Sequence, residues 1–226
     1  MERVERVVRH FQEELEQLKT RLLEMGGLAE ERVRLAVKGL VDRDHDLIDQ
    51  VLVGGDEPVN RLHIEIDNRC FTLLALYQPM AADLRTIVAA VKINTDLERV
   101  GDLAVNIAQR SISMLGRPQL KPLVDVPHMS KTVESMVRKS LDAFVQRDEA
   151  LARSVLLSDD EVDELKNSVY QELLGMLESG TAPAGTAFDL IFIAHNLERV
   201  ADHATNIAED VLFLIKGIDV RHHHLG

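Results

Sequence analysis

The segment Leu97-Glu-Arg-Val-Gly-Asp-Leu-Ala-Val-Asn-Ile-Ala108 returns 100 residues further along the chain as Leu197-Glu-Arg-Val-Ala-Asp-His-Ala-Thr-Asn-Ile-Ala208. Nine of the twelve positions are identical. A match of this length in a chain of 226 residues indicates a tandem duplication of the unit around it. We therefore expect two related halves, and we expect whatever the segment does to be done twice.

Weaker matches extend the duplication beyond this segment. Leu40–Asp44 corresponds to Phe144–Asp148, 104 residues later, and Val59–Leu62 corresponds to Val162–Leu165, 103 residues later. The offset decreases along the chain, which places small changes of length in the loops.

A proline-rich stretch separates the two copies. Gly116–Pro127 contains three of the six prolines, so it is the expected linker. We expect a first domain over residues 1–116 and a second over residues 117–226.

Apolar residues recur at helical spacing almost throughout the chain, as at Val33, Val37 and Leu40, and sustained alternation is absent. Helix breakers are expected at Gly54-Gly55, Pro79, Gly116–Pro127, Ser158-Asp159 and Gly180–Gly185. They divide each half into three main helices with short connections, which pack as an antiparallel bundle. The expected fold class is all-α, with two tandem three-helix bundles related by internal duplication.

Composition excludes several classes of function. The net charge of −12 argues against nonspecific binding of nucleic acid or anionic lipid, and it favours cations or basic protein surfaces as partners. Cys70 is the single cysteine, so neither an intramolecular disulfide nor a multi-cysteine zinc site is expected. No apolar run approaches the length that crosses a bilayer, and the N-terminus does not resemble a signal peptide, so we expect a cytoplasmic protein without membrane insertion.

The repeated segment places oxygen ligands in a row. At about 100° per residue, Glu98, Asp102 and Asn106 share one side of a helix, roughly opposite the apolar stripe that contains Leu97. Each step of four residues advances about 6 Å along the axis, so adjacent side chains can bridge neighbouring hard cations. The second copy repeats the row, and ligand type alone does not identify the metal. The candidate ligands from the two rows are Glu98, Asp102, Asn106, Glu198, Asp202 and Asn206.

A solvated helix face is the alternative interpretation. Acids at four-residue spacing are common on such faces, and Arg99 with Asp102 could form an ordinary exposed ion pair. The second, nearly identical copy favours metal, because exposed faces tolerate substitution after duplication. His203 follows Asp202 directly, and the rotation of about 100° between them disfavours it as a ligand. His195, three residues before Glu198, is given the same low weight. The triple histidine His222–His224 is interpreted as part of a native tail.

Four stretches carry a resemblance to a known family. Gln78-Pro-Met-Ala-Ala-Asp-Leu-Arg85, Leu97–Asp102 and Leu197–Asp202 resemble the PhoU family of phosphate-signalling regulators, and the ending Lys216–His222 is similar to the family's C-terminus. The resemblance covers almost the whole chain. It implies two three-helix bundles whose Glu/Asp-x-x-x-Asp motifs hold multinuclear iron or zinc clusters on the bundle surface.

The resemblance also implies ligands and a function. Glu98, Asp102, Glu198 and Asp202 would bind the metal, and Glu30 and Glu134, 104 residues apart, are candidates to complete the sites. The implied function is non-enzymatic: repression of phosphate-starvation signalling through contacts with the transporter ATPase subunit PstB and the sensor kinase PhoR. The outer faces of the bundles leave room for a homodimer.

Two other functions remain open. One is a helical scaffold that needs no metal. The other is a carboxylate-bridged metalloenzyme of the ferritin-like kind, which is disfavoured because no Glu here has His three residues later and because the motif acids are expected to point outward.

Overall fold

The computed structural model describes residues 2–118, 120 and 125–217, and these residues form seven helices and no strand. The all-α class is confirmed, and helices of the first half end close to the expected breakers at Gly54-Gly55, Pro79 and Gly116. The helices are α1 Glu2–Asp42, α2 His45–Leu52, α3 Glu57–Tyr77, α4 Ala81–Leu115, α5 Asp125–Gln146, α6 Glu149–Glu178 and α7 Ala184–Lys216.

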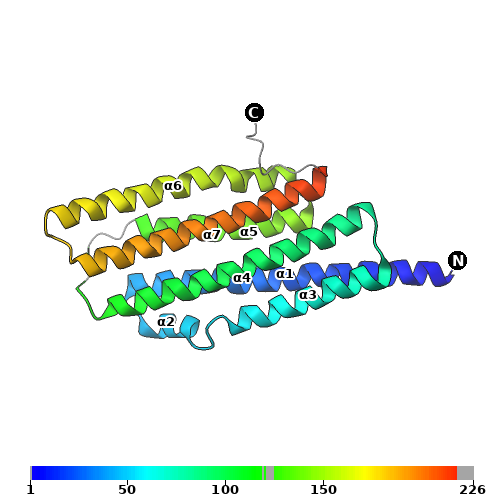
Figure 1. Cartoon of the computed structure of the whole chain (residues 1–226), viewed down its shortest axis with the longest axis horizontal. Helices are drawn as coiled ribbons and strands as arrows, with labels where there is room; N and C mark the ends of the chain where they lie inside the picture. Colours follow the sequence, from blue (N-terminus) through cyan, green and yellow to red (C-terminus); the bar gives the residue numbers. More distant parts are fainter. Residues whose placement is uncertain (1, 119, 121–124, 218–226) are drawn as a thin grey trace.

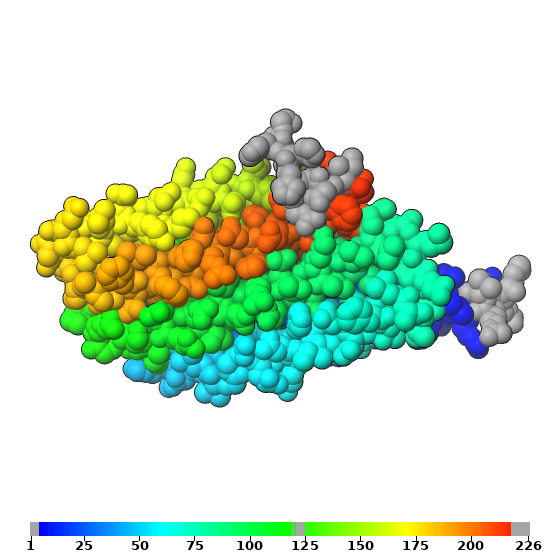
Figure 2. Space-filling model, in the orientation of Figure 1, coloured from blue at the N-terminus to red at the C-terminus, as the bar shows by residue number. Residues whose placement is uncertain are grey.

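The two halves lie side by side along their length (Figure 1). Helices α1, α3 and α4, with the short α2, form the first bundle, and α5, α6 and α7 form the second, as predicted. Helix α4 packs along α7, and α1 packs along α5. Buried apolar side chains from both bundles form one continuous core. Figure 2 shows α6, α7, α4 and α3 next to one another on one face, so the two helices with the repeated segment occupy its middle.

The apolar stripe of the repeated segment faces the core as predicted. Leu97, Val100 and Ile107 have no exposed surface, and the same is true of Leu197 and Val200 in the second copy. Burying side chains of this size contributes about 2 kcal/mol each to folding. The stripe therefore fixes the rotation of α4 and α7, and with it the direction in which the motif acids point.

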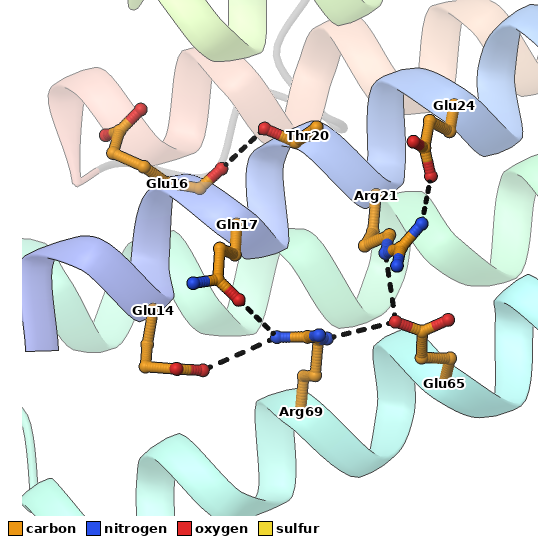
Figure 3. Close-up of polar contacts among 8 residues, drawn as sticks. All are labelled: Glu14, Glu16, Gln17, Thr20, Arg21, Glu24, Glu65 and Arg69. Carbon is orange, nitrogen blue, oxygen red and sulfur yellow. Dashed lines mark hydrogen bonds and ion pairs between the residues drawn. The ribbon is translucent and has the colours of Figure 1, made fainter.

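Polar contacts align α3 on α1 at the surface of the first bundle (Figure 3). The guanidinium of Arg69 on α3 donates to Gln17 Oε1 of α1 at 3.1 Å and to Glu65 Oε1 at 3.2 Å. Arg21 of α1 lies 3.0 Å from the same carboxylate oxygen of Glu65. These half-exposed contacts fix the register between the helices, whereas the free energy of folding comes mainly from the core.

The expected break at Ser158-Asp159 is wrong, because α6 runs through it without interruption. The corresponding part of the first half is divided into α2 and α3 by Gly54 and Gly55, which adopt positive φ angles of 82° and 52°. Ser and Asp are weak helix breakers in the absence of glycine or proline, so the second half forms one long helix where the first forms two.

The linker is shorter than the prolines suggest. Helix α5 begins at Asp125 and includes Pro127 in its first turn, where the missing N–H of proline costs nothing. The histidines 222–224 and linker residues 119 and 121–124 lie outside the described residues. In the described part of the chain, every helix is too short or too polar to cross a bilayer.

Candidate functional site

The acids of the first repeated segment point away from the core toward the start of α3. The side chain of Glu98 is 21% exposed and that of Asp102 is 30% exposed, so neither is fully solvated. Burial raises the pKa of Asp102, and the nearby carboxylate of Asp56 adds to the increase, while Arg99 opposes it. The structure therefore brings Asp56, at the N-cap position of α3, to the first motif.

Two arginines shape this first group of acids. The guanidinium of Arg99 lies 3.4 Å from Glu98 and 3.3 Å from Asp102, but its side chain is 56% exposed. Buried Arg32 of α1 donates to the carbonyl oxygens of Val51, at 2.6 Å, and of Gly55. Arg32 thus fixes the loop between α2 and α3 immediately before Asp56.

The acids of the second segment point toward α6. There they lie near Asp159 and Asp163. Burial, followed by the charges of Asp202 and Asp163, raises the pKa of Asp159 to about 6. Burial and the charge of Glu198 also raise the pKa of Asp202. Four carboxylates thus repel one another at this position, and a bound cation would offset the repulsion.

Lys166 of α6 lies among these carboxylates. Its Nζ donates to Asp163 Oδ1 at 2.7 Å and to Glu198 Oε1 at 2.9 Å. Burial alone would lower the pKa of Lys166, but the hydrogen bonds and charges of the two carboxylates raise it. The other oxygen of Glu198, Oε2, is buried without a hydrogen-bond partner, and His195 Nδ1 lies 3.3 Å from it without hydrogen-bond geometry.

Asp56, Asp159 and Asp163 are the site residues that sequence reasoning missed. The signal was present in the duplication, because the match of Val59 with Val162 extends three residues upstream to Asp56 and Asp159. One residue downstream, Asn60 of the first half corresponds to Asp163 of the second. The helix before the motif therefore supplies an acid to each site, and the second site has one acid more.

Other predicted residues lie elsewhere. Asn206 and His203 both bond to Asp96 Oδ1 of α4, at 3.3 and 2.8 Å, so they connect the two halves. Asn106 is half-buried on α4 without a side-chain hydrogen bond in the described part of the chain.

Glu30 and Glu134 lie near each other between α1 and α5. Glu30 is paired with Arg138, and Glu134 accepts a hydrogen bond from Ser130 at 2.7 Å. Burial raises the pKa of Glu134, and the charge of Glu30 adds to the increase. Glu30 and Glu134 thus bond to Arg138 and Ser130, and their part in a metal site stays a prediction.

The donor set suits a metal better in the second half than in the first. As the side chains stand, no three His, Cys, Asp or Glu residues within 2–118, 120 and 125–217 are arranged to hold a metal ion. The second site nevertheless offers four carboxylates, and one of them, Glu198, has a buried oxygen without a hydrogen-bond partner; these ligands suit a hard cation or zinc. The first site offers three carboxylates and carries the exposed Arg99.

Comparison with known proteins gives the same twofold division. The PhoU domain model matches residues 22–111 and again residues 126–211, one match in each half. Two relatives share the name phosphate-specific transport system accessory protein PhoU homolog. The one from Caulobacter vibrioides is 39% identical over 214 residues, covering 94% of this chain and 93% of the relative. The one from Pseudomonas aeruginosa is 38% identical over 217 residues, covering 96% and 89%.

Solved structures agree with the fold over nearly the whole chain. The crystal structure of PhoU from Pseudomonas aeruginosa has a TM-score of 0.86 at 39% identity, covering 92% of this chain and all (100%) of the other. The phosphate transport system regulatory protein PhoU from Streptococcus pneumoniae has the same TM-score of 0.86 at 27% identity, covering 93% and 99%. Both halves and the helix arrangement therefore match, and the chain belongs to the PhoU family.

Proposed function

We propose that this chain is a non-enzymatic regulator of phosphate uptake and signalling, acting as an accessory protein of a phosphate-specific transport system. The observation that supports this most directly is the family match, which covers both halves rather than a single repeat. The relatives that align over more than nine tenths of this chain bear the name of such an accessory protein.

The proposal extends to the partners. The chain represses phosphate-starvation signalling by bridging the ATPase subunit PstB and the sensor kinase PhoR at the cytoplasmic side of the membrane. The resemblance noted in the sequence suggests these two proteins, and the net charge of −12 favours basic surfaces on them.

The proposal also includes metal at the repeated motifs. Asp159, Asp163, Glu198 and Asp202 would hold iron or zinc in the second half, and Asp56, Glu98 and Asp102 would do so in the first. Bound metal supplies positive charge, which lets these crowded acids stay ionised together. The raised pKa values of Asp159 and Asp202 support this, because they reflect the cost of keeping the acids charged without a cation.

A reporter experiment tests the regulatory function. In a bacterium that lacks its own PhoU-family protein, a phosphate-starvation reporter is measured in phosphate-rich medium. This chain should lower the reporter, and a variant with Glu98, Asp102, Glu198 and Asp202 changed to alanine should not. A control variant changes exposed acids outside the motifs, Glu16, Asp46, Asp49 and Glu178, to alanine.

The outcomes separate the candidate functions. A reporter that stays high with the unmodified chain contradicts the regulatory proposal. Equal repression by the unmodified chain and the motif variant keeps the regulator and favours the metal-independent scaffold. Binding of purified PstB and PhoR to the same three proteins shows whether the motif acids act through partner contacts, because the scaffold predicts unchanged affinities.

A further inference from the structure

The Lys166 ammonium lies in a polar environment that is largely removed from water. Its side chain is 18% exposed, and that of its partner Glu198 is 19% exposed. By contrast, Lys38 pairs with Asp42 on α1 with side chains 50% and 47% exposed. Exposed pairs are screened and exchange readily with solvent ions, whereas a largely buried pair leaves an uncompensated charge when it opens.

The pair uses a carboxylate that belongs to the proposed metal site. Glu198 Oε1 accepts the hydrogen bond from Lys166 at 2.9 Å, and Asp163 Oδ1 accepts a second at 2.7 Å. A metal ion bound to Glu198 would lie within a few ångströms of the Lys166 ammonium, and two cations at that distance repel each other. The remaining oxygen, Glu198 Oε2, has no hydrogen-bond partner.

We propose that Lys166 is the resident counter-cation of the second site and that a metal ion binds there only when the Lys166 ammonium leaves Glu198. The inference rests on the proposed metal site and adds its regulation: metal and lysine compete for the same carboxylate. Metal entry then displaces a positive charge along the surface of α6, so the metal state of the second half changes the charge pattern that a partner meets.

The first half has no equivalent competitor. The residue at the position of Lys166 is His63, whose Nδ1 lies 3.3 Å from the carbonyl oxygen of Asn94 on α4. Asp163 is replaced by Asn60. Of the two arginines near the first motif, Arg32 donates to backbone carbonyls, and Arg99, which pairs with the motif acids, is more than half exposed and bonds over longer distances. The competition is therefore specific to the second half, and the two sites should fill at different metal concentrations.

Zinc titration of the full chain tests the competition. Glu98→Ala and Asp102→Ala are introduced first, so that only the second site is observed. In this background Zn²⁺ alone is titrated by calorimetry, with and without Lys166→Met, and with Lys131→Met as a control for an exposed lysine of α5. Lys166→Met should tighten zinc binding about tenfold or more, because one charged hydrogen bond no longer has to be broken. Lys131→Met should leave it unchanged.

Each result has a defined meaning. Zinc binding that is equally tight with and without the Lys166→Met substitution overturns the competition and leaves the metal site standing. Absence of zinc binding in all three proteins overturns the metal site itself, and the competition with it.

The NMR signal of Lys166 itself gives a second test, which does not depend on the affinity of one variant. Lysines of the unmodified chain are reductively methylated with ¹³C-labelled formaldehyde, and the Lys166 signal is identified by its absence in Lys166→Met. Zinc should shift this signal by releasing the amine from Glu198, and it should not shift the signal of Lys131. A Lys166 signal that is unmoved at saturating zinc contradicts the proposal, even if the substitution alters affinity through charge alone.

Discussion

In the first half Glu98 and Asp102 are paired with Arg99, whose side chain is 56% exposed, whereas in the second half Glu198 is paired with Lys166, whose side chain is 18% exposed. The equivalent of Arg99 in the second copy is Arg199, which is exposed and forms no ion pair in the described part of the chain. The duplication has therefore kept the acids on the motif helices while the cation that neutralises them has moved to a neighbouring helix.

The two sites also differ in the backbone that carries their additional acid. Asp56 follows a glycine loop that buried Arg32 fixes through backbone carbonyls. Asp159 lies inside the continuous helix α6. A helical position holds a side chain more rigidly than a loop position, so the second site is better preorganised. For the proposed metal sites, the comparison predicts that the second binds metal more tightly and that the first depends on one buried arginine.

The largest expected change in stability comes from replacing Arg32. Arg32→Met gives the first half the residue that the second half has at the corresponding position, Met136, which is buried. The change leaves the carbonyls of Val51 and Gly55 without their donor, so the free energy of unfolding should fall by about 3 kcal/mol. Urea denaturation followed by circular dichroism measures it. A loss below about 0.5 kcal/mol would mean that the loop before Asp56 does not need Arg32.

The next largest change in stability is expected when the ion pair between Lys166 and Glu198 is broken. Lys166→Met leaves Glu198 partly buried without its cation, so metal-free protein at pH 7 should lose about 2 kcal/mol of stability. Denaturation in the presence of a chelator measures this loss. Added zinc should recover most of it, because the metal takes over the neutralising role. Stability that is unchanged by the substitution would place the Lys166 pair among ordinary surface contacts.

A smaller effect of opposite sign is expected at Asp159. Its pKa is raised to about 6 in the folded protein, so the folded state favours the protonated acid and loses stability as pH rises from about 4 through 6. Asp159→Asn removes this loss and should stabilise metal-free protein by about 1 kcal/mol at pH 7, after allowance for solvent screening, and by almost nothing at pH 3.5. Unfolding curves at both pH values test the sign, with Asp56→Asn as the matched change in the first half. A variant that is less stable at pH 7 would contradict the carboxylate repulsion.

The smallest effect is expected at Arg99. Its pairs with Glu98 and Asp102 are exposed and long, so Arg99→Met should change stability by no more than about 0.5 kcal/mol. Thermal unfolding of this variant beside Lys166→Met compares the two resident cations directly. Equal losses in the two variants would remove the proposed difference between the halves.

The sequence predicts the all-α class and the directions of the motif acids because apolar periodicity and duplication are local signals. It does not predict which helix faces Glu198, since that depends on the packing of α6 against α7. The sequence therefore does not place Lys166 at the site, although this residue directly follows the aligned stretch Val162–Leu165. His203 shows the same difficulty: its neighbour Asp96 belongs to the other half of the molecule. Helix α6 continues through the expected break because Ser158-Asp159 contains neither glycine nor proline.

The metal content of untagged protein purified without oxygen tests the central claim most directly. It is measured by mass spectrometry beside a variant with Glu98, Asp102, Glu198 and Asp202 changed to alanine, after circular dichroism has shown that the variant is still helical. We predict iron or zinc at one or more equivalents per chain in the unmodified protein and almost none in the variant. Equal trace metal in both would contradict the account and make the repeated acids a solvated face.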